Sequence, residues 1–150
     1  PFLEESIPPS LLKGSYSNPQ ANDWGRRIAR HDGYITTVAE YNHGPTAVLK
    51  NALDSAFNEW VRKPIAFVGY GNVGGARAIE QLRGVAIELQ MAPLRHEVNI
   101  LREVYMAVAN REKQLDDYEY LLNARNDLFD NLVWWANALR TARSKLRLVQ

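Results

Sequence analysis

Two short apolar runs, each followed by a polar or glycine-rich stretch and then by helical periodicity, dominate the first half of the chain. Residues 33–38 and 65–68 have the length and composition of buried strands. A polar stretch, 39–44, follows the first run, and a glycine-rich one, 69–75, follows the second. Strands that alternate with helices predict a parallel α/β sheet, which binds ligands at the carboxyl ends of its strands. We therefore expect the two loops to line one site.

Apolar residues at helical spacing predict four helices. A short one covers residues 23–31, and a second opens at Pro45, which suits a first helical turn, and stops at the Lys63-Pro64 pair. A third covers 76–89. A fourth and longer helix covers 116–146, with a break near Asn126 left open as an alternative. Its predicted apolar stripe consists of Leu128, Leu132, Trp135 and Leu139.

The remaining segments complete a partial α/β domain over residues 1–150. Residues 96–100 predict a third strand, which we place at an edge because it is short and less apolar, and 101–114 is left unassigned. Residues 1–19 hold four of the seven prolines and predict an extended connection, which leaves 20–150 as the α/β body and C-terminal helix. Three strands make a thinner sheet than usual.

Composition narrows the class of protein. A chain of 150 residues with 46% hydrophobic and 23% charged residues is an ordinary globular sequence. Its net charge of +1 gives no reason to expect a nucleic acid or an anionic membrane as partner, and no apolar run approaches a membrane span. The absence of cysteine excludes disulfides, thiol catalysis and thiolate metal sites, and it fits a cytoplasmic location. His31 and His96 lack metal-ligand spacing, so we expect no metal.

The glycine-rich loop leaves several interpretations open. Its sequence, Gly69-Tyr-Gly-Asn-Val-Gly74, fits the dinucleotide-binding pattern G-x-G-x-x-G. A Rossmann domain also needs an acidic residue at the end of the next strand, whereas Glu97 lies at the start of the predicted strand. A tight turn with a glycine packing contact is the simplest alternative. In each case the glycines let backbone N–H groups approach a flat or anionic ligand.

A resemblance to a known family gives a more specific interpretation. Ala39-Glu-Tyr-Asn-His-Gly44 resembles the Pro-Glu-Tyr-Asn loop of the NAD(P)H-dependent FMN reductase family, flavodoxin-like proteins that include quinone and azo-dye reductases. Leu49-Lys-Asn-Ala-Leu-Asp54, Lys63-Pro64, the glycine loop and Gln81-Leu-Arg83 are similar to further segments of that family. The resemblance extends over about residues 20–100. Three departures are Ala39 for proline, Gly69 for serine and Asn72 for glycine; asparagine tolerates positive φ, which makes the last one mild.

The resemblance implies a flavodoxin-like parallel sheet with helices on both faces, from which the N-terminal βαβ portion is absent. The family's first strand and its serine-rich phosphate loop have no counterpart in this sequence. Because that strand is central in the order 2-1-3-4-5, its absence exposes an edge of the strand at 34–38. We expect the sequence to be incomplete at its N-terminus.

The resemblance also implies bound FMN, with NAD(P)H as co-substrate and a quinone, free flavin or azo-type compound as acceptor. The implied cofactor-binding residues are Glu40, Tyr41, Asn42, His43, Tyr70, Gly71, Asn72, Gly74 and Gly75. Tyr41 is expected to pack near the flavin ring, Asn42 to hydrogen-bond it, and the amides of 71–75 to meet its pyrimidine edge. No catalytic residue is named, because the cofactor carries the chemistry.

Some of these assignments keep a structural alternative. Glu40 can instead cap the helix that opens at Pro45, and His43 can be a polar surface group. The basic end formed by Arg140, Arg143, Lys145 and Arg147 suits a helix C-terminus. Trp134 and Trp135 cannot both face the core, so an exposed one would suit the subunit interface of a homodimer or homotetramer. The alternatives to a reductase are a flavodoxin-like binding or regulatory module without flavin and an NAD-binding Rossmann fragment.

Overall fold

The structure is a four-stranded sheet in the order β2-β1-β3-β4. In the computed structural model, which describes residue 11 and residues 16–147, β1 (Tyr34–Tyr41), β3 (Pro64–Tyr70) and β4 (Ala92–Ile100) are parallel. The two-residue strand β2 (Gly44–Pro45) pairs antiparallel with the end of β1 and was not predicted. The predicted parallel sheet is confirmed. β4 begins at Ala92, before the predicted start at residue 96. The predicted strand was too short because polar residues alternate with apolar ones along β4, which leaves only a short apolar run.

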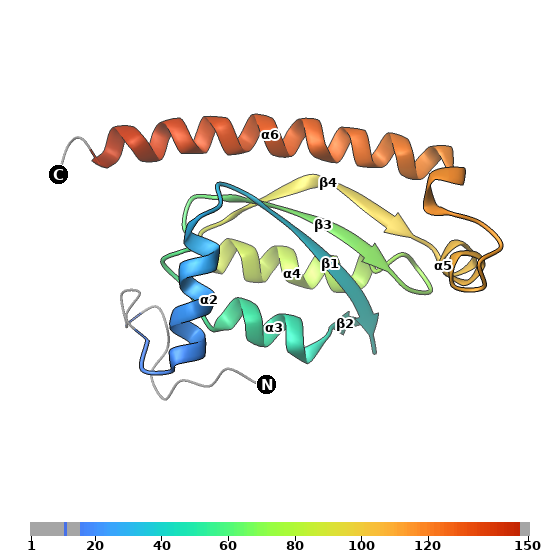
Figure 1. The fold of residues 1–150 in the computed structure, drawn as a ribbon, viewed down its shortest axis with the longest axis horizontal. Coiled ribbons are helices and arrows are strands. Elements are labelled where there is room, and N and C mark those ends of the chain that lie inside the picture. Colours follow the sequence, from blue (N-terminus) through green and yellow to red (C-terminus); the bar gives the residue numbers. More distant parts are fainter. Residues whose placement is uncertain (1–10, 12–15, 148–150) are drawn as a thin grey trace.

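Helices cover both faces of the sheet, as predicted (Figure 1). α2 (Pro19–Ala29), α3 (Ala47–Asp54) and α4 (Ala76–Glu88) lie on one face, and α6 (Glu119–Arg147) lies on the other. β3 is the strand buried on both sides: Ile65 and Phe67 pack in the core with α4, whereas Ala66 packs in the core with α6. The strand is therefore held between two apolar layers, as parallel sheets require.

The second helix is shorter than predicted. It begins at Ala47, and Thr46 is its N-cap, because the side chain of Thr46 accepts a hydrogen bond from the amide of Leu49. Pro45, predicted to open the helix, lies in β2 instead. The helix ends at Asp54, and the residues up to the start of β3 form turns. Trp60 is nevertheless buried, because its ring packs against those of Trp24 and Tyr34, and its indole nitrogen donates to the carbonyl of Leu53 at 3.0 Å. Apolar spacing alone did not distinguish these turns from helix.

The N-terminal segment is described only in part. Most of the predicted connection over 1–19 lies outside the described residues, and Leu11, which is described, has helical backbone. α2 begins at Pro19, earlier than the predicted start at residue 23. The side chain of Asn18 caps this start by accepting a hydrogen bond from the amide of Gln20. An asparagine cap followed by proline at the first helical position is a sequence signal for this start.

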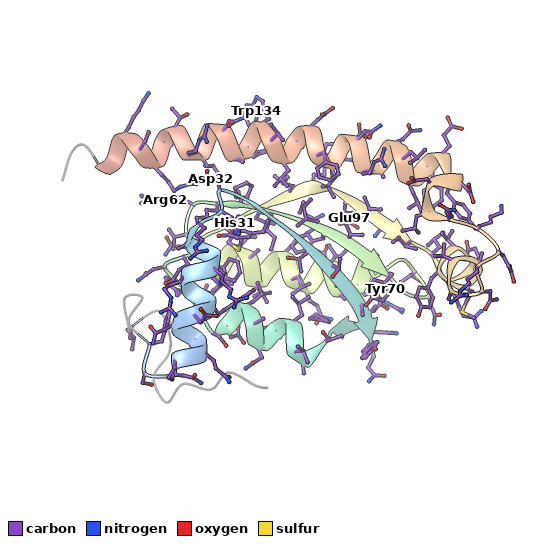
Figure 2. The ribbon with its side chains drawn as sticks, viewed as in Figure 1. His31, Asp32, Arg62, Tyr70, Glu97 and Trp134 are labelled. Carbon is purple, nitrogen blue, oxygen red and sulfur yellow. The ribbon has the colours of Figure 1, made fainter. Side chains whose placement is uncertain are left out.

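The long terminal helix α6 is unbroken at Asn126. Leu121, Leu128 and Leu132 face the sheet, and the next inward position is Ala136, which lies close to Gly33. Because the inward positions Leu128, Leu132 and Ala136 follow one another at intervals of four residues, Trp135, which was predicted in the apolar stripe, lies outside the core. Trp134 is 64% exposed and Trp135 38% exposed, and Trp134 points away from the sheet (Figure 2). The unassigned segment holds α5 (Arg102–Ala109) and a 3-10 turn, Leu115–Asp117.

Polar contacts fasten the C-terminal part of α6 to the amino ends of the strands. Arg143 forms an ion pair with Asp32, just before β1, and donates to the carbonyl of Arg62, just before β3, at 2.5 Å. Asp32 and Arg62 lie together beneath α6 (Figure 2). Part of the predicted basic end thus has specific partners in addition to the helix dipole. This end of the sheet is opposite to the edge where the predicted loops lie.

One edge of β1 is open. β1 pairs with β3 from Tyr34 to Ala39, but on its other side only Glu40 and Tyr41 meet β2, and no strand among residues 16–147 pairs with the rest. Ile35, on this strand, is 41% exposed. This is the exposure expected for a sheet of this type without a neighbouring strand. Within the described residues, no helix is long and apolar enough to cross a membrane.

The packing of α6 predicts the effect of truncating Leu128, which is almost fully buried. We expect Leu128→Ala to lower the free energy of unfolding by about 2–5 kcal/mol, since it leaves a cavity between α6 and the sheet. The same substitution at the exposed Leu115 should change it by less than about 0.5 kcal/mol. Urea denaturation of both variants measures the difference, and equal effects would contradict the packing described here.

Candidate functional site

The first predicted loop is a tight hairpin. β1 continues to Tyr41, which pairs with Gly44 of β2, so only Asn42 and His43 lie in the turn. Both have left-handed backbone, with φ of 51° and 68°. A two-residue type I′ turn requires positive φ at both positions, and asparagine and histidine adopt it more readily than most residues. The sequence therefore favours this turn without glycine at its centre.

The second predicted loop folds back on the strand that precedes it. Its first two residues, Gly69 and Tyr70, belong to β3, and it ends at Gly75, the left-handed N-cap of α4. A Cβ atom on Gly69 would lie 2.3 Å from the carbonyl oxygen of Gly74, and one on Gly75 would lie 2.8 Å from the Cα of Gly69. These glycines are required by close approach. Asn72 is not among the described residues with positive φ, so the backbone places no special demand on it.

The buried carboxylate of Glu40 joins the two loops. Only 4% of its side chain is exposed. It accepts from the backbone amide of Arg77 at 3.2 Å and from Arg77 Nε at 2.6 Å, in the first turn of α4. A Cβ on Gly71 would lie 3.4 Å from the Cβ of Glu40, so the glycine loop passes directly beside it. Glu40 thus caps a helix, but this helix is α4, and not the one expected at Pro45.

The predicted site residues are brought together at the carboxyl edge of the sheet, with different exposure. Tyr41 is 67% exposed, and Asn42, His43 and Asn72 are also exposed. Tyr70 and Gly71 are half-buried, whereas Gly74 and Gly75 are buried. Tyr70 lies at the end of β3 nearest α5 (Figure 2). The exposed group is the part that can contact a ligand, and the buried glycines shape the loop beneath it.

Several amides of the glycine loop are already engaged. Gly71 donates to the carbonyl of Ile100 at 3.4 Å, and Gly74 donates to that of Gly71 at 3.1 Å. At the exposed tip, the amides of Asn72 and Val73 have no acceptor among the described residues. A carbonyl or anionic edge of a flat ligand would therefore find its donors at this tip rather than along the whole segment.

The sequence interpretation missed four supporting residues. Arg77 and Gln81 of α4 contact the hairpin, and the Nδ2 atom of Asn99 donates to the carbonyl of Gly74 at 3.0 Å. Tyr105 of α5 stacks on Tyr70, with ring centroids 6.0 Å apart. The i,i+4 spacing of Arg77 and Gln81 was a usable signal, because it puts both on one helix face directly after the glycine loop. No such signal existed for Asn99 or Tyr105, because the strand predicted at 96–100 was short and the segment 101–114 was left unassigned.

The acidic residue considered for a Rossmann site has a structural partner. Glu97 lies inside β4 and not at its end, and it forms an ion pair with Arg83 at 2.5 Å, both side chains being mostly buried. It therefore does not lie where a ribose-binding carboxylate would be needed. Among the described residues, no cluster of three histidine, aspartate or glutamate side chains is placed to hold a metal ion.

A parallel α/β sheet with a tight hairpin and a glycine loop meeting at its carboxyl edge has the arrangement at which open α/β proteins place their ligands. Comparison with known families makes this class specific: residues 2–103 match the model of the NADPH-dependent FMN reductase family. The chain belongs to this family.

Relatives and a solved structure agree with that assignment. Over 90 residues the chain is 37% identical to an NAD(P)H-dependent FMN reductase of Schizosaccharomyces pombe, and this alignment covers 59% of this chain and 45% of the relative. Over 84 residues it is 33% identical to an NADPH:quinone oxidoreductase of Arabidopsis thaliana, with 53% and 42% covered. The chain spans about half the length of the curated relatives it matches.

The fold comparison is with FerB, a flavoenzyme NAD(P)H:(acceptor) oxidoreductase from Paracoccus denitrificans. Its TM-score is 0.59 at 18% identity, and the match covers 91% of this chain and 76% of FerB. At this identity the likeness concerns the fold, and it confirms the flavodoxin-like class expected from the resemblance.

The close approach at Gly69 predicts a large cost for a side chain there. We expect Gly69→Ala to lower the free energy of unfolding by about 1–3 kcal/mol, because the new Cβ overlaps backbone atoms of the glycine loop. Gly84→Ala is the matched control: a Cβ there meets nothing within 4 Å, so it should stabilise α4 by about 0.5–1 kcal/mol. Denaturant unfolding compares the two, and an unharmed Gly69→Ala would mean that the loop follows another path.

Proposed function

We propose that this protein, at its natural length, is a cytoplasmic, FMN-dependent NAD(P)H oxidoreductase that reduces a quinone, free flavin or similar acceptor. The observation that carries the proposal is the meeting of the Asn42–His43 turn and the glycine loop through Glu40, in a chain of this family. The names of the relatives, FMN reductases and quinone reductases, support the choice of cofactor and acceptor.

The residues at the carboxyl edge fit one side of a flavin ring. Tyr41 offers an exposed aromatic face and Asn42 an exposed amide. The tip of the glycine loop offers the backbone amides of Asn72 and Val73, which have no acceptor within the part of the chain that the structure describes. Glycines at the base of the loop leave no side chain in the way of a flat ligand. When bound, FMN supplies the hydride acceptor and donor for the reaction.

The protein's own part is therefore to bind and orient. Donors at Asn72 and Val73 would face the ring edge on which negative charge develops during reduction, and that interaction favours the reduced cofactor. Tyr41 would pack against the ring, and Asn42 would hydrogen-bond its edge. No described side chain needs to act as an acid or base in this scheme. The contacts with the phosphate group are not assigned to residues of this chain.

A visible spectrum of the protein at its natural length tests the proposal. We expect flavin absorption bands in the purified protein, or their appearance as FMN is bound on titration, and oxidation of NADH or NADPH when a benzoquinone is added. A folded protein that remains colourless and takes up no FMN would contradict the reductase assignment and favour a binding module. Nicotinamide binding without flavin would favour the Rossmann alternative, which the engagement of Glu97 by Arg83 disfavours.

The exposed tyrosine gives a residue-level prediction. Tyr41→Ala should raise the dissociation constant for FMN about tenfold, since an aromatic contact contributes roughly 0.5–1.5 kcal/mol beyond its buried area. It should leave the melting temperature unchanged, because Tyr41 is exposed. Ile87→Ala, at an exposed apolar residue near the end of α4, is the control for loss of surface area. Quenching of FMN fluorescence on binding measures both, and equal affinities would argue against a contact between Tyr41 and the ring.

We also propose that the protein is a homodimer or homotetramer. An exposed apolar strip on α6, formed by Phe129, Val133 and Trp134, supports an interface between subunits. Light scattering on the purified protein distinguishes a dimer or tetramer from a monomer.

A further inference from the structure

The contacts of Arg77 reach beyond the carboxylate it neutralises. Its Nε atom and its backbone amide both donate to Glu40, at 2.6 and 3.2 Å. Its Nη1 atom lies 2.7 Å from Nε2 of His43, in the turn. One side chain on α4 thus holds both the buried end of β1 and the exposed turn that follows it. An arginine has the several fixed donors that such a double contact needs.

Gln81, one helical turn further along α4, also contacts this turn. Its Nε2 atom donates to the carbonyl of His43 at 2.7 Å. It also lies over Gly44, where an added Cβ would be 3.2 Å from its Oε1 atom. Both the ring and the carbonyl of His43 are therefore fastened to one face of α4. The i,i+4 spacing of Arg77 and Gln81 is what puts them on that face.

The turn needs such support. Asn42 and His43 are consecutive non-glycine residues in left-handed backbone, a conformation that costs free energy for L-residues, although less for asparagine and histidine than for most. Both are exposed, and β2, which closes the hairpin, is only two residues long. A two-residue strand gives little stabilisation of its own. The side chains of α4 supply fixed contacts from outside the hairpin.

We propose that Arg77 and Gln81 are positioning residues that fix the Asn42–His43 turn in the conformation that receives the flavin ring. The inference rests on the proposed function for its ligand, but the geometry of the turn does not depend on it. Neither residue need touch the cofactor. A turn held in place before binding loses less conformational freedom when the ligand arrives, so its affinity is higher.

The direction of the contact between Arg77 and His43 follows from the chemistry of arginine. Arginine can only donate, so Nε2 of His43 is the acceptor in this contact. The charged groups that the described contacts place against His43 are Arg77 on α4 and, across Arg77, Glu40 on β1. Only a side chain with several donors can hold both Glu40 and His43 in this way.

Amide hydrogen exchange in the flavin-free protein, at its natural length, tests the support of the turn. In Gln81→Met, which leaves the Glu40–Arg77 pair intact, we expect exchange at residues 41–44 to be about tenfold faster, the equivalent of one lost hydrogen bond. Arg77→Met should have at least that effect. Arg27→Met is the matched control, because Arg27 forms an exposed ion pair with Asp23 on α2, far from the turn. Unchanged exchange at 41–44 in Gln81→Met overturns the inference.

Binding of FMN, followed by fluorescence quenching, forms the second arm. Gln81→Met should raise the dissociation constant about tenfold and Arg77→Lys, which keeps the charge but not the fork, by a similar factor. Variants that exchange faster yet bind FMN as the parent does would also overturn the inference. A parent protein that binds no FMN would instead contradict the proposed function.

Discussion

The arrangement of the candidate site depends on the pairing of Glu40 with Arg77. A carboxylate that is only 4% exposed is unfavourable unless its charge is matched and its oxygens accept hydrogen bonds. Arg77 meets both needs with its guanidinium and its backbone amide, and the position of this amide in the first turn of α4 adds the favourable dipole of the helix. The end of β1 is thereby fixed against the start of α4, with the glycine loop between them. Two segments more than thirty residues apart in the sequence become one surface.

This constraint gives separate roles to residues that the sequence presents as one list. The buried glycines, Gly74 and Gly75, allow the loop to close on Gly69, and the exposed residues Tyr41, Asn42 and Asn72 form the surface above it. The departure at Gly69 is notable in this light. The family that the sequence resembles has serine at this position, whereas in this structure a Cβ on residue 69 would overlap the carbonyl of Gly74. The glycine loop of this chain thus follows a path that a serine at this position would oppose.

Much of the fold could be predicted from the sequence, because β3 is a continuous apolar run and the helices flanking it have clear periodicity. The predictions failed where local pattern is a poor guide. β4 alternates polar and apolar residues, so only its last part was recognised, and the turns around Trp60 keep a helix-like spacing without a helix. Trp135 was placed inward because a large aromatic residue suits a core, but the step from Leu132 to Ala136 turns it outward. These outcomes depend on tertiary packing.

Which residues bind the cofactor stays a prediction, whereas the contacts that hold these residues together could not be predicted from the sequence. Glu40 was recognised as either a cap or a ligand, but its partner on α4 could not be found from local sequence, since only the folded sheet brings β1 to that helix. The most direct test of the account is the change in amide hydrogen exchange when FMN is added to the protein at its natural length. The account predicts slower exchange at both residues 41–44 and residues 71–75. Protection of only one loop, or of neither, would contradict a single flavin site built from the two.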